Sequence, residues 1–196
     1  MFTLIIYAVA IALYGLFYCW YVGFRQKVTT EEVEALITRY QKGSAITPEL
    51  AASLGVFFGN DDGKDFVMVN LLHLKQPFKE SRTKLEAYQK IFLGQLLKKA
   101  GHPVMFGRAA STNIENLNCD TANDWTAFGM VRYRSRRDFL EMLLGTINSE
   151  HHKLKLDALQ KTLGFPSAPW SMMGGPKILV PMALALLAMI LQLALA

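Results

Sequence analysis

Two long uncharged segments at the ends of this chain constrain its fold more than any other feature. No charged residue occurs from 2 to 24 or from 178 to 196. Each segment approaches the length of about 20 apolar residues that a helix needs to cross the hydrocarbon core of a bilayer. We therefore expect a transmembrane helix over 2–24, a second over 178–196, and one water-soluble domain with a single core between them.

Positive charges beside the two segments predict an orientation. Arg25 and Lys27 follow the first segment, and Lys177 precedes the second. Because Lys and Arg next to a span stay on the cytoplasmic side, the middle of the chain is expected to face the cytoplasm at a bacterial inner membrane. Charge follows the first apolar run rather than preceding it, which favours an uncleaved anchor over a secretory signal. The second segment contains Pro181 and Gln192, and packing against protein is its alternative to spanning.

The composition of the middle segment narrows the classes of partner. The net charge of +5 arises entirely there, which suits anionic lipid headgroups but equally an ordinary basic surface. No recognition-helix or stacking motif indicates nucleic acid. The nucleophile elbow is missing, which argues against a nucleophilic mechanism. The glycine pattern of a nucleotide fold is also missing, and no cofactor is expected. Cys19 in the apolar segment cannot readily reach Cys119 in a polar loop, and no disulfide is expected.

The region 29–58 is predicted to be a helical linker of two short helices. Thr29 and Glu32 have capping-box spacing, and Thr47 followed by Pro48 is typical of a second helix start. The side chains expected to face inward are Val33, Leu36, Ile37, Tyr40, Leu50, Leu54 and Phe57. Such a pair could form a lever between the membrane and the main fold, but additional cover for the core of that fold is the simpler interpretation.

The region 62–166 alternates between strand and helix patterns. An almost continuous apolar run predicts a strand that is covered on both faces. The expected strands lie at 66–74, 104–110, 125–133 and 161–165, and the expected helices lie at 81–99, from 135 onward and at 149–159. The order β-α-β-β-α-β is that of an α+β, ferredoxin-like domain, in which helices cover one face of an antiparallel sheet.

A set of short motifs runs through the same region. They are Asp62-Gly63, Phe66-Val67-Met68-Val69-Asn70-Leu71-Leu72, Ala87-Tyr88, Gly107-Arg108, and Trp125 leading into Tyr133-Arg134-Ser135 with Phe139 and Met142. Together they resemble the DUF1330 family of the dimeric α/β-barrel superfamily. The resemblance implies a homodimer of ferredoxin-like units packed sheet against sheet, with a small cavity in each subunit. It implies no particular activity, because relatives include cofactor-free monooxygenases, isomerases, haem-dependent enzymes and simple ligand binders.

Four residues are candidates to line that cavity: Asn70, Arg108, Tyr133 and His152. An amide in an apolar strand needs partners or a ligand, since leaving it unsatisfied costs about 1 to 3 kcal/mol. Asn70 therefore either binds the sheet backbone or faces a ligand. His152 lies at the approximate position of a histidine in the resembled family. His73, three residues after Asn70, points to the opposite face of its strand, and a solvated histidine is its simpler interpretation.

An arginine cluster is the most conspicuous charged feature. Arg132 and Arg134 share one face of a strand end, and Arg136 and Arg137 follow. These four side chains are predicted to contact an acidic molecule or lipid headgroups, with a solvated basic face as the alternative. The neighbouring His151 and His152 point about 100° apart on a helix and cannot chelate one ion together, so no metal site is expected.

The patterns identify no catalytic residue. The leading hypothesis is a membrane-anchored homodimer that binds a small hydrophobic or acidic molecule, or that serves as an accessory subunit in a larger membrane assembly. The alternative is a cofactor-independent oxidoreductase or isomerase acting on a small molecule that partitions from lipid. In that case the four cavity candidates would orient the substrate and move a proton. A membrane scaffold with an empty barrel is the third hypothesis.

Overall fold

The computed structural model describes residues 2–24, 26–43, 47–115, 117–118, 124–146, 149–169 and 174–195. Arg25, one of the flanking charges, and Cys119, on which the expectation about a disulfide depends, lie outside these ranges. The chain divides into two compact units. One comprises Met1–Phe24 and Pro169–Ala196, and the other comprises Arg25–Ala168.

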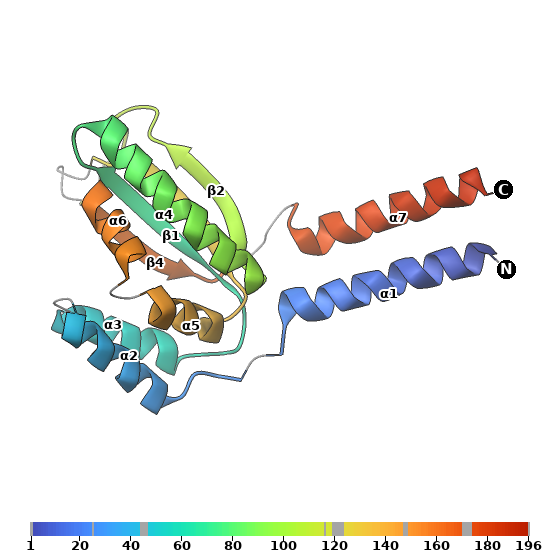
Figure 1. Ribbon diagram of the computed structural model, residues 1–196, viewed down its shortest axis with the longest axis horizontal. Helices are drawn as coiled ribbons and strands as arrows, with labels where there is room; N and C mark the ends of the chain where they lie inside the picture. Colours follow the sequence, from blue (N-terminus) through green and yellow to red (C-terminus); the bar gives the residue numbers. More distant parts are fainter. Residues whose placement is uncertain are drawn as a thin grey trace. The chain divides into compact units, whose positions relative to one another are not determined.

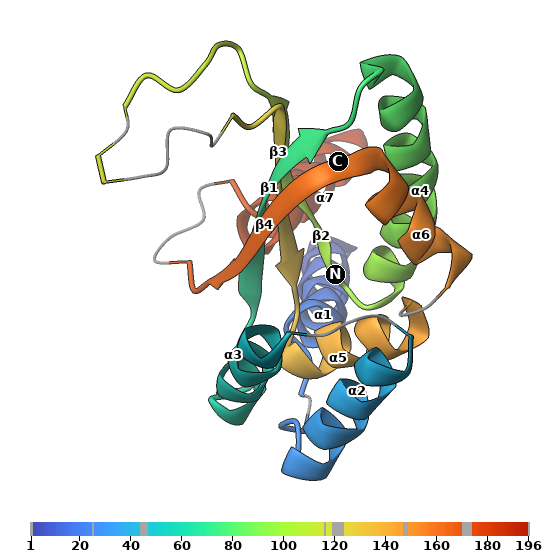
Figure 2. The same cartoon turned by 90° about the vertical axis from the view of Figure 1, so that its left-hand side faces the viewer.

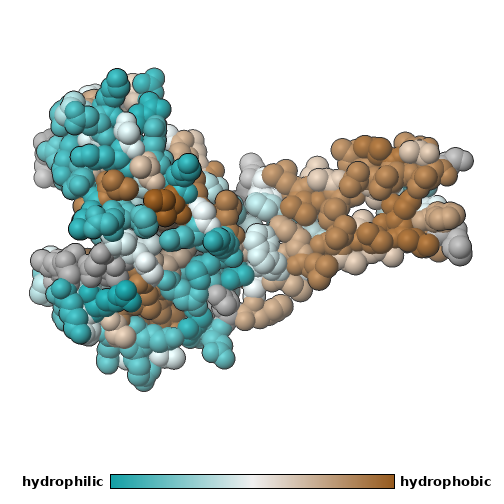
Figure 3. All heavy atoms as spheres, viewed as in Figure 1, coloured by the Kyte–Doolittle hydropathy of each residue, from teal (hydrophilic) through white to brown (hydrophobic). Residues whose placement is uncertain are grey.

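The first unit is a pair of antiparallel helices, α1 (Phe2–Val22) and α7 (Pro176–Ala194), which lie side by side (Figure 1). Within the described residues, these two helices are long and apolar enough to cross a membrane by length and composition. Figure 3 shows a nearly continuous hydrophobic surface over them. The Tyr7 hydroxyl donates a hydrogen bond to Gln192 Oε1 at 2.8 Å. Gln192, a polar side chain within the second apolar segment, therefore has a hydrogen-bond partner on the neighbouring helix.

The second unit is a mixed α+β domain built on a four-stranded antiparallel sheet. Its strands are β1 (Phe66–Leu74), β2 (His102–Arg108), β3 (Ala127–Tyr133) and β4 (Leu159–Ser167), in the spatial order β2-β3-β1-β4. Between them come α4 (Phe78–Lys98) after β1, and α5 (Arg136–Thr146) and α6 (Glu150–Ala158) before β4. The predicted elements are confirmed with shifted ends. The last strand is longer than expected because β4 pairs along almost the whole length of β1.

One face of β1 packs against helices. Phe66 and Leu72 point toward the helices, and Figures 1 and 2 show α4 and α6 lying along one side of the sheet. Phe66 packs in a core cluster with Leu96, Val131, Tyr133 and Met142. On α4, Leu96 is buried and Leu97 is exposed, because consecutive residues lie about 100° apart around a helix.

Two further helices, α2 (Thr30–Gly43) and α3 (Pro48–Gly59), belong to the core of this domain. The predicted caps are confirmed. The Thr29 and Glu32 side chains each accept a hydrogen bond from the other residue's backbone N–H, and Thr47 accepts one from the Leu50 N–H at 3.2 Å. Val33, Leu36, Phe58 and Leu140 form one buried cluster. The helix pair therefore covers the core, and the most buried side chain of α3 is Phe58, which the sequence did not single out.

An ion pair joins the start of the domain to α5. The Arg137 guanidinium donates to Glu32 Oε1 at 2.7 Å, and also to the backbone carbonyls of Gln26 and Lys27. Hydrogen bonds from Arg137 and from the Thr29 N–H lower the pKa of Glu32 to about 2. The folded state therefore favours the ionised carboxylate.

Replacing Glu32 with Gln is expected to lower the free energy of unfolding at pH 7 by about 1 kcal/mol, a modest loss because the pair is partly exposed. The wild-type advantage should disappear as pH falls from about 4.5 toward about 2, because the carboxylate then becomes protonated in the folded state too. Urea unfolding of the full-length protein in detergent micelles across this range measures both effects. Glu34→Gln removes the same charge from an exposed position of α2, and an equal loss in that control would contradict the assignment.

Candidate functional site

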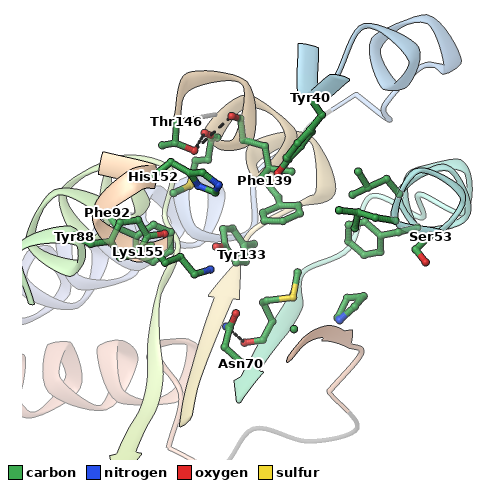
Figure 4. A pocket seen from close by; sticks show the side chains of 18 residues that line it. Tyr40, Ser53, Asn70, Tyr88, Phe92, Tyr133, Phe139, Thr146, His152 and Lys155 are labelled. Carbon is green, nitrogen blue, oxygen red and sulfur yellow. Dashed lines mark hydrogen bonds between the residues drawn. The ribbon is translucent and has the colours of Figure 1, made fainter. Parts of the chain in front are cut away.

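A cavity of about 320 Å³ lies inside the domain, between the sheet and helices α3, α5 and α6 (Figure 4). Its walls are mainly apolar and aromatic. Those walls include Leu50, Leu54, Phe57, Met68, Phe92, Phe139, Met142 and Leu143. Leu50 was expected to face inward, and it lines this space but is 45% exposed. A smaller hollow of about 70 Å³ shares Asn70, Tyr88, Phe92, Tyr133 and Lys155 with the larger one.

Gly164 lies in the floor of the cavity beside Asn70. Asn70 is paired with Gly129 of β3 on one side and with Gly164 of β4 on the other. Neither neighbour has a side chain, and a Cβ on Gly164 would already lie 3.4 Å from Asn70 Oδ1. A larger residue at Gly164 would fill the space above Asn70, whereas the Phe106 ring already lies where a Cβ on Gly129 would be, at 2.8 Å. The open space beside Asn70 thus depends on the register of β1 with β4.

Asn70 combines the two roles that the sequence left open. Its Nδ2 donates to the backbone carbonyls of Met68 at 3.3 Å and Gly129 at 3.4 Å. With Nδ2 committed to the sheet, Oδ1 is the atom that the side chain directs into the cavity (Figure 4). Asn70 therefore binds the sheet backbone and also presents a hydrogen-bond acceptor to the cavity.

Tyr133 is held rigidly at the centre of an aromatic cluster. Its ring stacks on Phe66 with centroids 5.2 Å apart and meets Phe139 edge-on at 4.8 Å. The residue is 5% exposed and lines the cavity, as expected from the strand pattern. Burial raises the pKa of Tyr133 well above the ordinary tyrosine value. The phenol therefore stays protonated at neutral pH and can donate a hydrogen bond.

Helix α6 contributes two nitrogen-bearing side chains. Ser149 caps the helix by accepting a hydrogen bond from the His152 N–H at 3.3 Å. His152 and Lys155 are three residues apart, share one face of the helix and both line the cavity. Burial, and secondarily the nearby Lys155, lowers the pKa of His152, so its imidazole is neutral at pH 7.

Lys155 is the cavity residue that the sequence analysis missed. Its amine lies 6.0 Å from the centroid of the Tyr88 ring and is directed toward the space between Tyr133 and Asn70 (Figure 4). Burial lowers the pKa of Lys155 below the ordinary lysine value. The helical spacing from His152 was the available signal, because a residue three positions later shares its face.

The remaining histidine and arginine candidates lie elsewhere. Arg108 is exposed at the end of β2, paired with Ala127, and does not line the cavity. His73 is on the opposite face of β1 from Asn70, with Nδ1 against the carbonyl oxygen of Asp124. Three of the four predicted cavity residues are therefore brought together. Among the described residues, no three His, Cys, Asp or Glu side chains gather closely enough to hold a metal ion.

The arginine cluster has partners inside the domain. Arg132 is 1% exposed, and its Nε donates to Asp65 Oδ2 at 2.8 Å while Nη1 donates to the Ala100 carbonyl at 2.8 Å. Arg134 makes a two-pronged pair with Asp138 at 2.7 and 2.9 Å. Arg136 donates to the Phe57 carbonyl, and Arg137 holds the start of α2. These contacts give each of the four guanidinium groups a partner within the domain, where the sequence predicted an acidic molecule or lipid headgroups.

Comparisons with known proteins extend only to the fold. No family model matches the chain, and no curated protein matches it. A crystal structure of RPA0582, a protein of unknown function from Rhodopseudomonas palustris, is 21% identical over 65% of this chain and 97% of that chain, with a TM-score of 0.52. The methylated form of that protein is 20% identical over 67% of this chain and 96% of that chain, with the same TM-score of 0.52. A hydroxynitrile lyase from Passiflora edulis gives 13% identity, 56% and 97% coverage and a TM-score of 0.42. The domain thus shares an α/β fold with an uncharacterised protein.

Replacing Lys155 with Met is expected to raise the free energy of unfolding at pH 7 by about 1 kcal/mol, because a charge-bearing amine no longer has to be buried. In the wild type, stability should rise with pH between the lowered pKa and 10.5, where the unfolded chain binds the proton more tightly. The variant should lack this rise. Urea unfolding in detergent micelles from pH 7 to 10.5 measures both effects.

Lys153→Met is the matched control for that variant. Lys153 lies two residues earlier on α6, is exposed, and pairs with Glu150 at 2.7 Å. Its replacement should change stability by less than about 0.5 kcal/mol. A destabilised Lys155→Met protein beside an unaffected control would show that the amine supports the fold.

Proposed function

We propose that this chain is a membrane-anchored protein whose α+β domain binds one small, mostly apolar molecule in the cavity. The observation that carries the proposal is the partly open space of about 320 Å³ with apolar and aromatic walls and a few polar groups. Small-molecule sites share this design, because apolar walls supply affinity and a few placed polar atoms fix orientation. Asn70, Tyr133, His152 and Lys155 supply polar atoms of this kind.

The domain is proposed to be a ferredoxin-like unit of the DUF1330 type that forms a homodimeric α/β barrel. The strand order and the β-α-β-β-α-α-β succession support the fold. The sheet face away from α4 supports the dimer, because Leu163 and Phe165 on β4 are 50% and 46% exposed there beside Leu71 and Val69 of β1. A second copy placed sheet to sheet would cover these apolar side chains.

Helices α1 and α7 are proposed to span a bacterial inner membrane, with the domain in the cytoplasm. Their length and apolar composition support insertion, and Lys27 and Lys177 beside their ends support the orientation. A ligand that partitions into lipid would then be concentrated near its binding domain. The helix pair could also join the protein to a larger membrane assembly as an accessory subunit.

A cofactor-independent oxidoreductase or isomerase is the second candidate. It is favoured by one observation, the presence on one cavity of a neutral imidazole, His152, and a protonated phenol, Tyr133. A neutral imidazole can accept a proton and a phenol can donate one, which is the minimum for shifting a proton on a bound substrate. Arg108, which was expected to help, lies outside this group.

Native mass spectrometry of the full-length protein, released gently from membranes, tests the binding function. A dimer that carries a reproducible small-molecule mass is expected. Leu54→Trp should abolish that mass, because the indole occupies the cavity, while Val56→Trp should retain it, because Val56 is 65% exposed on the same helix. A bare wild-type dimer, or the same mass in a folded Leu54→Trp dimer, would contradict binding in this cavity.

The orientation is tested with a single cysteine. Lys153→Cys in a chain whose two native cysteines are replaced puts a thiol on the exposed face of α6. A membrane-impermeant maleimide should label it in inverted membrane vesicles and leave it unlabelled in intact spheroplasts. Labelling in spheroplasts would reverse the orientation, and release of the protein by alkaline carbonate would refute insertion.

A further inference from the structure

We propose that the molecule held in the cavity is a small organic acid, and that its carboxylate pairs with the amine of Lys155. The inference rests on the proposed binding function and names the chemical class of the ligand. It starts from the position of one amine in a space whose other walls are apolar.

Lys155 faces an imbalance of charge. The described residues that line the larger cavity include no Asp or Glu. The amine lies over the face of the Tyr88 ring, 6.0 Å from its centroid, and the ring supplies a weak attraction but no counter-charge. A cation among apolar side chains is costly unless it is paired and hydrogen-bonded. An anionic ligand would provide the missing partner.

The position of the amine also suits a ligand whose carboxylate lies at one end of an apolar body. Lys155, Asn70 and Tyr133 line both hollows, so the amine lies at the junction between the space of about 320 Å³ and the space of about 70 Å³. Phe57, Leu54 and Phe139 line the larger hollow alone. An acid bound with its carboxylate at the junction would therefore extend an apolar body toward α3 and α5.

The neighbouring polar atoms fit the same orientation. The Tyr133 phenol remains protonated and can donate to a carboxylate oxygen beside the amine. Asn70 offers Oδ1, an acceptor, because Nδ2 is bonded to Met68 and Gly129 carbonyls. An acceptor repels a carboxylate, so the anion is directed to Lys155 and Tyr133 rather than to the floor of the cavity.

The arginines do not provide a competing anion site in this cavity. Arg132 and Arg134 are bonded to Asp65 and Asp138. Arg108 does not line the space. The basic side chains among the described residues that line the cavity are His152 and Lys155. Because His152 is neutral, Lys155 is the one that can offer a positive charge to a ligand.

Matched acids and alcohols test the inference on the full-length protein in phosphatidylcholine nanodiscs. The probes are butyrate, 4-phenylbutyrate and decanoate, each with the alcohol of the same carbon skeleton, measured by calorimetry against empty nanodiscs. At least one acid is expected to bind about tenfold more tightly than its alcohol at pH 7, as for a hydrogen bond to a charged group. Lys155→Met should reduce that preference to less than about twofold, and Lys153→Met should preserve it.

Each other outcome overturns the inference in a distinguishable way. Equal binding of acid and alcohol, with both lost in Leu54→Trp, would support a site for an apolar ligand and reject the inference that the ligand is an acid. Retained acid preference in Lys155→Met would assign the anion to another group. If no probe binds, the acid class is rejected, while the mass found by native mass spectrometry still decides the proposed function. Lys155→Gln replaces the Met variant if that variant does not fold.

Discussion

Pairing of β1 along both its edges is the constraint on which the rest of the domain depends. β3 and β4 each bind almost the full length of this apolar strand, so the register of all three is set together. That register puts Gly129 and Gly164 on either side of Asn70 and puts Tyr133 beside Phe66. A slip by one residue would exchange the two faces of β1 and remove both the floor of the cavity and the aromatic cluster.

The helices then cover one face of this sheet and leave a partly open cavity against it. Helices α2 and α3 add Leu36 and Phe58 to the core, while Arg137 ties their start to α5. Helix α6 brings His152 and Lys155 over the same face of the sheet. Packing of apolar side chains fills most of the interior, and Gly164 leaves space beside Asn70. Burial in that part keeps Tyr133 protonated and disfavours charge on His152 and Lys155.

Much of the architecture could be predicted from local patterns. Both apolar helices, the helix caps at Thr29 and Thr47, and each strand of the sheet were expected, because periodicity and capping depend on neighbouring residues. Asn70, Tyr133 and His152 were also assigned to one cavity. Lys155 was not assigned to the cavity, because a lysine in a polar helix resembles any solvated lysine until the fold shows what covers it.

The sequence by itself determined the division into two apolar helices and one α+β domain, since transfer to lipid or water depends on the composition of each segment. Only the tertiary structure decided what the charged side chains do. Arg132 and Arg134 were expected to meet an external anion, yet they lie against Asp65 and Asp138. The physical reason is clearest for Arg132, because Asp65 lies 67 residues away in the chain and becomes its partner only when packing brings the two strand ends together. Arg134 and Asp138 are only four residues apart, but burial of that pair likewise depends on the packing around it.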